Sequence, residues 1–284
     1  MRIHAIQTGT VAIHERQRAG KGRGPVRLAM TLADRRFTEP LPILAWLIEH
    51  HDGLILVDTG ETARALEPGY LPGWNVYYRL AVREQVTTDQ EIGPRLAALG
   101  FNTADVRHVV LTHMHTDHAG GLHHFARSEV HVSRAELAAA TGRLGKLRGY
   151  LPHRLPEWLE PRPVDFDAGP FGPFATSHTL ADGVTLVPTP GHTPGHLSVA
   201  VRTEDRLVLL AGDTSYTQAL MQAGVADGIT LDAATERATL RRIQALARSE
   251  PLVYLPTHDL DSVRRLAEAE VVERVPVGTL PEPG

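Results

Sequence analysis

The sequence predicts an α+β fold in which two mixed β-sheets pack face to face with helices outside each sheet, an αββα sandwich. Three observations support this prediction. Short apolar runs with strand character fill each half of the chain, segments with helical character follow each group of strands, and no clean linker divides the 284 residues. We therefore predict one domain spanning residues 1–284.

The first half of the chain opens with strand signals. The N-terminal segment MRIHAIQTGTVAI alternates in polarity, and apolar runs at 43–49 and 54–58 flank Asp52-Gly53, which is a hairpin signal. The elements expected next are a helix over 89–99 ending before Gly100, a strand over 106–111, a helix starting within 119–125, a strand over 129–132 and, after the capping Ser133, a helix over 134–140.

The second half repeats this order. The elements expected there are strands over 184–188, 196–202 and 206–210, a helix over 233–247 capped by Asp232, a strand over 251–255 and a helix over 259–269. Two insertions interrupt the pattern near the rim of the site proposed below. Residues 61–86 suit an irregular or partly helical excursion, and residues 141–178 are long enough for a functional lid.

Composition narrows the function classes. With 42% hydrophobic residues, 22% charged residues and a net charge of −4, the chain is globular and lacks the basic excess of a nucleic-acid-binding protein. The basic stretch Arg16–Arg27 is Gly-rich and is interpreted as a mobile loop. No signal-peptide core or membrane-spanning run is present, so we expect no membrane partner and a cytoplasmic location. Because cysteine is absent, a zinc site must use His, Asp or Glu.

The stretch THMHTDHAGG, residues 112–121, crowds metal-binding side chains directly behind an apolar strand. On an extended backbone His113 and His115 can point to the same side, whereas Asp117 and His118 project a few ångströms away. One loop can thus supply two ligands to each of two adjacent metal ions. Chance clustering of so many ligand types at one strand end is improbable.

Further ligands should lie at other strand ends. His192 in TPGHTPGH, Asp213 in LLAGDTSY and His258 in VYLPTHD each follow a predicted strand and turn. One ion would then be held by His113, His115 and His192, and the other by Asp117, His118 and His258. Asp213 can bridge both, since a carboxylate has two oxygens. Zinc is the expected metal, with Mn, Fe or Co also compatible with such a donor set.

The other histidines are interpreted as structural. The chain holds 16 histidines, and isolated ones commonly lie in cores or on surfaces without a catalytic role. His196 begins a predicted strand, which favours a structural role over ligation.

The motif HMHTDH, together with Asp58 in LVDTG and His192, Asp213 and His258, resembles the metallo-β-lactamase superfamily of hydrolases over residues 43–258. The resemblance implies the αββα fold with a dinuclear site at the sheet edge. It also implies that Asp58 either steadies a ligand loop or accepts a hydrogen bond from a ligand histidine. From the residues alone, Asp58 could equally be a turn residue at a strand end.

Tyr216, three residues after Asp213 in GDTSY, looks like the tyrosine of the N-acyl homoserine lactonase branch. This likeness implies that the substrate is an N-acyl homoserine lactone, whose ring is opened by a metal-bridging hydroxide. Its biological role would be quorum quenching. Tyr216 would donate to the carbonyl oxygen and Asp117 would carry the proton. Candidate wall residues for an acyl groove are Met30, Trp74, Tyr77, Tyr78, Tyr150, Phe171, Phe174 and Met221.

Two alternatives remain open at this point. The same donor set could serve a dinuclear hydrolase of another ester class, such as an aryl ester or phosphotriester, with the two insertions deciding specificity. The second alternative is a non-catalytic binding protein that kept the fold, although no ligand position is lost here. Either a monomer or a homodimer is compatible with the sequence.

Overall fold

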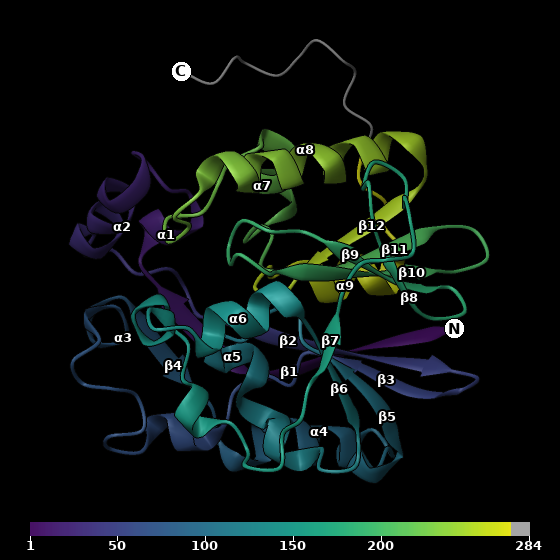
Figure 1. The fold of residues 1–284 in the computed structure, drawn as a ribbon, viewed down its shortest axis with the longest axis horizontal. Coiled ribbons are helices and arrows are strands. Elements are labelled where there is room, and N and C mark those ends of the chain that lie inside the picture. The colour runs from purple at the N-terminus through teal and green to yellow at the C-terminus, as the bar shows by residue number, and fades with distance from the viewer. Residues whose placement is uncertain (274–284) are drawn as a thin grey trace.

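The computed structural model describes residues 1–273, so the end of the predicted 1–284 domain, residues 274–284, lies outside the described part of the chain. The strands form two sheets, one of seven strands in the order β4-β1-β2-β3-β5-β6-β7 and one of five in the order β12-β11-β10-β9-β8. Both sheets mix parallel and antiparallel pairs. Figure 1 shows them packed together between layers of helices, which confirms the predicted αββα arrangement.

The strands of the first sheet are β1 (Arg2–Ile13), β2 (Leu41–His50), β3 (Gly53–Val57), β4 (Val82–Gln85), β5 (Val106–Val110), β6 (Glu129–Ser133) and β7 (Arg162–Val164). Those of the second are β8 (His178–Ala181), β9 (Val184–Pro188), β10 (Leu197–Arg202), β11 (Leu207–Gly212) and β12 (Leu252–Pro256). The helices are α1 (Glu15–Arg18), α2 (Gly24–Ala33), α3 (Val76–Leu80), α4 (Ile92–Ala98), α5 (Thr116–Ala119), α6 (Arg134–Thr141), α7 (Gln218–Ala223), α8 (Ala233–Ser249) and α9 (Ser262–Glu268).

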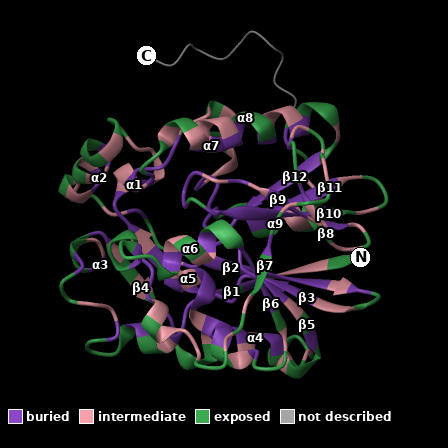
Figure 2. Ribbon diagram, in the orientation of Figure 1, coloured by how far each residue is buried: buried purple, intermediate pink, exposed green. Residues whose placement is uncertain are grey.

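Three of the four apolar clusters in the described core form layers on and between the sheets, and β2 shows why. Its alternate residues Trp46 and Ile48 pack between the two sheets with residues such as Leu186 of β9. Its other face places Leu47 in the layer beneath α4, whose Leu96 is fully buried. Because both faces of β2 are covered, its sequence is continuously apolar rather than alternating. Figure 2 shows buried strands at the centre and exposed helix faces outside.

The third layer lies under α7 and α8. Leu240, Ile243 and Leu246 of α8 pack on Leu209 of β11. Their spacing of three residues places them on one helical face, as an amphipathic surface helix requires. Asp232 accepts hydrogen bonds from the first-turn amides of α8, which confirms the predicted cap.

The prediction for the basic stretch Arg16–Arg27 was wrong. Instead of a mobile loop, this stretch contains most of α1 and the first turn of α2. Arg27 is 3% exposed and its guanidinium donates to the backbone oxygens of Ala226 and Asp227. The glycines at 20, 22 and 24 favoured a mobile loop. The residues that bind Arg27 lie two hundred positions away in sequence, so no local pattern could indicate that the stretch is held in place.

Both insertions contain sheet edges that the sequence did not reveal. Residues 61–86 include α3 and β4, which pairs with β1, and residues 141–178 include β7, which pairs with β6. The helix expected within 119–125 starts earlier, because α5 begins at Thr116 and a 3-10 turn follows over Gly120–His124. The helices expected over 89–99 and 259–269 are shorter, as α4 and α9.

The described helices include none that is both long and apolar enough to cross a membrane.

Candidate metal centre

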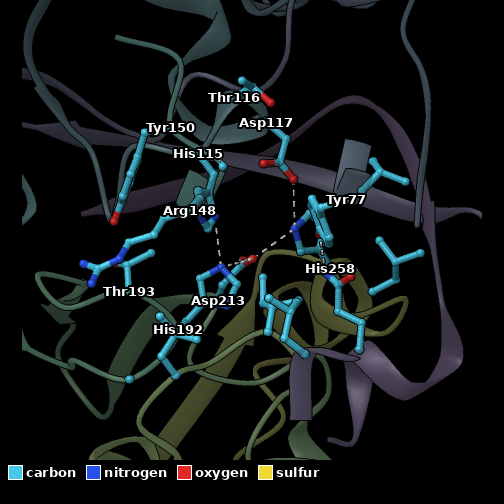
Figure 3. A pocket seen from close by; sticks show the side chains of 18 of the residues that line it. Tyr77, His115, Thr116, Asp117, Arg148, Tyr150, His192, Thr193, Asp213 and His258 are labelled. Carbon is cyan, nitrogen blue, oxygen red and sulfur yellow. Dashed lines mark hydrogen bonds and ion pairs between the residues drawn. The ribbon is translucent and has the colours of Figure 1, made fainter. Parts of the chain in front are cut away.

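The candidate site lies at one edge of the sandwich, where loops leave the ends of several strands. The loop after β5 and the first turn of α5 carry His113, His115, Asp117 and His118. The other positions follow further strands, as predicted: His192 after β9, Asp213 after β11 and His258 after β12. The structure brings all of these side chains together. Five of them, His115, Asp117, His192, Asp213 and His258, line one cavity and are labelled in Figure 3.

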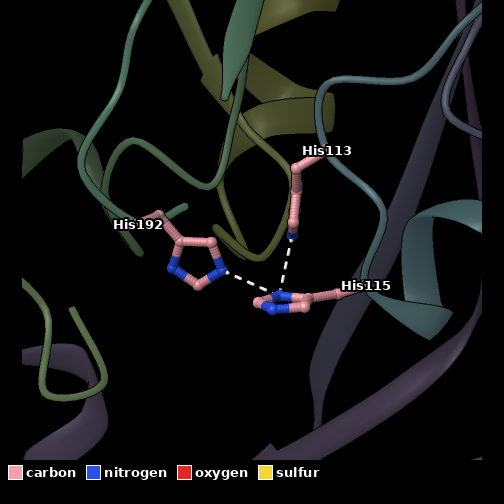
Figure 4. A group of neighbouring side chains, drawn as sticks. All are labelled: His113, His115 and His192. Atoms are coloured by element: carbon pink, nitrogen blue, oxygen red, sulfur yellow. Dashed lines mark hydrogen bonds between the residues drawn. The ribbon is translucent and has the colours of Figure 1, made fainter. Parts of the chain in front are cut away.

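Three imidazoles form the first cluster (Figure 4). His113 Nε2 lies 3.0 Å from His115 Nδ1, and His115 Nδ1 lies 3.1 Å from His192 Nε2. His113 and His192 are buried and His115 is half-buried, and the rings of His115 and His192 line the cavity. Three nitrogen ligands within this spacing match the reach of one tetrahedral metal ion.

Two histidines and one carboxylate form the second cluster. His258 Nε2 lies 3.3 Å from Asp117 Oδ2, and His118 Nε2 lies 3.9 Å from Asp117 Oδ1. Asp213 lies between the clusters. Its Oδ1 is 3.3 Å from His118 Nε2, while its Oδ2 is 3.3 Å from His258 Nε2 and 3.6 Å from His192 Nε2.

The second nitrogen of each imidazole is engaged away from the centre. His115 Nε2 lies 3.0 Å from the oxygen of Arg148, and His258 Nδ1 lies 2.8 Å from the oxygen of Pro42. Because a carbonyl oxygen only accepts, these nitrogens carry protons, so the inward-facing nitrogens are the ones that can offer lone pairs to a metal ion once they have released any proton of their own. This outer bonding orients each ring and fixes its tautomer.

Carboxylates do the same for two other rings. His118 Nδ1 lies 2.9 Å from Asp58 Oδ2, and His192 Nδ1 lies 2.7 Å from Asp227 Oδ2. Asp58 also accepts from the backbone N–H and hydroxyl of Thr112. It adopts a φ of 59°, which is sterically costly for a non-glycine residue and is tolerated where surrounding bonds enforce it.

These contacts test whether a cation fits the site. His115 Nδ1 and His192 Nε2 face each other at 3.1 Å. Burial lowers the pKa of His192, but the carboxylates of Asp227 and Asp213 raise it to about 9, so this contact already holds a positive charge that a metal ion could replace. Among residues 1–273, His118 Nε2 and Asp213 Oδ1 are buried 3.3 Å apart and neither has a hydrogen-bond partner. Buried polar atoms that lack partners are costly, and ligation to a divalent cation would satisfy both. The residues present therefore fit a metal centre.

The charges of the site point the same way. Burial alone would lower the pKa of His258, but the facing carboxylates of Asp213 and Asp117 raise it to about 10. Burial also opposes ionisation of Asp117, yet His118 and His258 hold its pKa at about 2. The carboxylates thus stay ionised and attract positive charge, which protons supply when no metal is bound.

His196 keeps the structural role expected from the sequence. Its Nε2 accepts the backbone N–H of Asp213 at 3.0 Å, and its Nδ1 lies 2.9 Å from the hydroxyl of Thr189. Gly212 has a φ of 56° and lies so close to this ring that a Cβ would be 2.6 Å from His196 Nε2. A glycine at the end of β11 is therefore needed to let the histidine support the Asp213 backbone.

Two residues that hold the candidate ligands in place were not predicted from the sequence. Glu136 of α6 accepts from the amide of Met114 and from the hydroxyl of Thr193, so it joins the two loops that carry the first cluster. Asp227 accepts from the amides of Ile229 and Thr230 while its other oxygen binds His192. Asp227 lies in a turn-forming ADGIT segment that resembles an ordinary loop, so only the fold shows its contact with His192.

The centre opens into a cavity of about 600 Å³. Of the eight candidate groove residues, Tyr77, Tyr78 and Tyr150 line it, whereas Met30, Trp74, Phe171, Phe174 and Met221 do not. Phe174 and Met221 pack instead in the layer under α8. One side of the cavity, which we call the N-terminal wall, consists of Val11, Ile13, Gln17, Leu28, Tyr77, Val82 and Glu84.

Tyr216 also lines the cavity and its ring stacks on His258, with centroids 5.8 Å apart and planes at 21°. It is 4% exposed, and burial raises the pKa of its hydroxyl well above the ordinary value. The phenol therefore stays protonated at neutral pH, and its ring lies against one of the candidate metal ligands.

Comparison with known proteins gives relatives of two kinds. A protein named as a probable metallo-hydrolase of Mycobacterium tuberculosis is 40% identical over 177 residues, which cover 60% of this chain and 56% of that protein. The matched segment thus spans little more than half the length of the mycobacterial relative. An N-acyl homoserine lactonase of Bacillus cereus is 28% identical over 222 residues, 78% of this chain and 82% of that protein.

A solved structure extends the likeness to the fold. The structure of an N-acyl homoserine lactone hydrolase, with the product N-hexanoyl-L-homoserine bound at its catalytic metal centre, matches with a TM-score of 0.75 and 25% identity. The match covers 92% of this chain and 94% of that one. A family model described as the metallo-beta-lactamase superfamily matches residues 38–258, which include all seven residues of the candidate centre. The chain belongs to the metallo-beta-lactamase superfamily of hydrolases.

Proposed function

We propose that this protein is a dinuclear metal-dependent lactonase that opens N-acyl homoserine lactones. The observation that carries the proposal is the position of Asp213 between two clusters of inward-facing ligands, at the floor of a cavity that Tyr216 also lines. The lactonase relative from Bacillus cereus and the product-bound hydrolase structure support this substrate class.

Seven residues would hold the two ions. His113, His115 and His192 would bind one, Asp117, His118 and His258 the other, and the two oxygens of Asp213 would contact both. Two divalent cations bound there would supply Lewis acidity and a nucleophile derived from water near neutral pH. Zinc suits the imidazole and carboxylate donors, although the donor set also accepts Mn, Fe or Co.

The chain itself would handle the carbonyl and the proton. Tyr216 has a protonated hydroxyl beside His258, so it can donate to the ester carbonyl oxygen as negative charge develops there. Asp117 has an ionised carboxylate with an 18% exposed side chain at the cavity floor. It can accept the proton of the attacking group and deliver it to the leaving alkoxide.

Apolar side chains would hold the acyl chain. Val11, Ile13, Leu28 and Val82 of the N-terminal wall, with Ile229 and Leu231 from the loop before α8, line the same cavity. Each buried methylene of an acyl chain contributes roughly 0.8 kcal/mol when it leaves water. Longer acyl chains should therefore bind more tightly.

The test is a substrate panel run on metal-loaded protein. We expect lactones with medium and long acyl chains to turn over fastest, and Tyr216→Phe to reduce kcat by about 10²-fold. Tyr70→Phe is the matched control, since Tyr70 does not line the cavity. Faster turnover of phosphotriesters or aryl esters than of lactones would overturn the proposal and favour another ester class.

A further inference from the structure

Gln17 connects two tyrosines at the cavity by hydrogen bonds, and the proposed reaction assigns no role to this connection. It belongs to α1, is 2% exposed and lines the cavity. Its Nε2 donates to Tyr77 Oη and to Tyr216 Oη, both at 2.7 Å. Three distant segments, α1, α3 and the loop after β11, thus meet at a single amide group.

The direction of these bonds decides what the hydroxyls can do. An amide nitrogen has two hydrogens, so each phenol oxygen receives one and keeps its own proton free to donate. The reversed amide would leave both N–H groups without partners, whereas the observed orientation leaves only Oε1 unpartnered. Two unpartnered buried donors cost more than one unpartnered acceptor, so the donating orientation is favoured.

The two hydroxyl protons have no partner in the described part of the protein. Within residues 1–273, Tyr77 Oη and Tyr216 Oη have hydrogen bonds only to Gln17. Both side chains line the cavity, and ordinary phenols remain protonated near neutral pH. A ligand in the cavity is therefore the natural acceptor for both protons.

We propose that Gln17 is a positioning residue that presents Tyr216 and Tyr77 as a pair of O–H donors for two carbonyl oxygens of one substrate. Tyr216 serves the reacting ester carbonyl, as its stacking on His258 places it at the candidate metal centre. Tyr77 serves a second carbonyl, in the acyl arm. This inference rests on the proposed lactonase function and specifies the substrate class as a lactone that carries an acylamino group.

The spacing fits this substrate class. Two 2.7 Å bonds from one nitrogen, spread at the roughly 120° of an amide group, place the hydroxyl oxygens between about 4 and 5 Å apart. In an N-acyl α-amino lactone, one carbon and one nitrogen separate the ester and amide carbonyl carbons. Such a short connection can bring the two carbonyl oxygens to a similar separation.

The fold holds Gln17 in place for this role. Its backbone N–H donates to the oxygen of His14, and its backbone oxygen accepts from Gly228 at 2.7 Å. Tyr77 is held from the other side, because the side chain of Asn75 caps its amide and its ring packs edge-on against Tyr78. The donor pair is therefore set before substrate enters, which reduces the cost of binding.

Substitutions of Gln17 test the direction of the bonds. Gln17→Met removes them with little change in size, and we expect kcat to fall about tenfold with full metal content. Gln17→Glu keeps the size and can still form two hydrogen bonds, but its carboxylate would accept the hydroxyl protons. We expect it to be at least as slow as Gln17→Met. In a Tyr216→Phe background, Gln17→Met should have little further effect on kcat.

Tyr77→Phe tests the second carbonyl. We expect kcat/KM to fall about tenfold for an N-acyl homoserine lactone and to stay unchanged for an alkyl γ-lactone that lacks the amide. This contrast needs no substitution of Gln17, so it remains decisive even where the Gln17 variants fail to fold.

Each contrary result overturns a specific part. Restored activity in Gln17→Glu, or equal losses from Gln17→Met with and without Tyr216, would assign Gln17 a purely structural role. Equal losses on both lactones would remove Tyr77 as a reader of the acyl arm. If Tyr216→Phe itself kept full activity, the proposed function would lose its oxyanion donor. If kcat fell in Tyr216→Phe but stayed unchanged in Gln17→Met, the inference about Gln17 would be overturned and the proposed function would stand.

Discussion

The metal-facing floor of the cavity and its N-terminal wall are built by different rules. On the floor, five imidazoles each use one nitrogen for a bond to the protein and turn the other inward. On the wall, Gln17 donates one hydrogen bond to Tyr77, while Oε2 of Glu84 is buried with no partner in the described part of the chain. The floor is therefore rigid and committed to one chemistry, whereas the wall keeps donors and acceptors available to a substrate.

This difference predicts how substitutions on the two sides should behave. Changes on the floor should remove metal and activity together, because each ligand is oriented by a bond behind it. Changes on the wall should leave metal content intact and alter substrate binding or stability. Four experiments probe this contrast, taken here from the largest expected effect to the smallest.

Asp213→Ala should be the most damaging change, because both of its oxygens face the clusters. We expect bound metal to fall well below the wild-type content and kcat/KM to drop by on the order of 10³-fold. Elemental analysis of the purified protein and lactone kinetics measure the two effects. Asp205→Ala, an exposed carboxylate beside β11, is the control. Full metal content in Asp213→Ala would contradict the bridging role.

Asp227→Asn tests the bond behind a ligand without touching the ligand. Asp227 holds His192 Nδ1 at 2.7 Å, and loss of its charge should weaken metal affinity about 10- to 100-fold. Competition with a chromogenic chelator measures this affinity. Asp167→Asn, whose side chain is 77% exposed, provides the matched control. Unchanged affinity would show that the ring needs no support from Asp227.

Leu28→Ser should change the wall alone. Leu28 lines the cavity from α2, so a polar side chain there should raise KM for long acyl chains about three- to tenfold and leave kcat and metal content unchanged. Kinetics with short and long acyl chains measure the difference. Leu80→Ser, at an exposed position that does not line the cavity, is the control. A loss that is equal for both chain lengths would exclude Leu28 from the acyl site.

Glu84→Gln should have the smallest effect and act on stability. Burial, followed by repulsion from Glu61 and Asp117, raises the pKa of Glu84 well above 4.5. An unfolded chain releases this proton first, so the wild type loses stability as pH rises above about 4.5. Glutamine lacks this penalty, and we expect Tm to rise by about 2–4 °C at pH 8 and less at pH 5.

Thermal melts at the two pH values measure the change. Glu157→Gln, a carboxylate away from the cavity, should leave Tm unchanged at both. A Tm gain in Glu84→Gln that does not depend on pH would mean that the ionised carboxylate is not the source of the penalty.

The order of elements and the donor set were predictable because each depends on local pattern. Apolar runs such as 43–49 and 184–188 indicated strands of both sheets, and HMHTDH indicated ligands at a strand end. Parallel strands such as β11 and β12 bring their carboxyl ends to the same edge, so Asp213 and His258 could be expected to meet. The prediction that one loop supplies residues to both clusters agrees with the structure, because His115 lies in the first cluster and His118 in the second.

Only the tertiary structure determined the contacts between segments that lie far apart in sequence. Asp227 reaches His192 across 35 positions, and Gln17 reaches Tyr216 across 199. Neither residue carries a local signal, since an Asp in a turn and a Gln in a basic stretch occur in any protein. Periodicity and motifs report what a residue's neighbours in the chain require. The support of the metal ligands and the shape of the wall depend on packing between distant elements, which only the folded chain brings together.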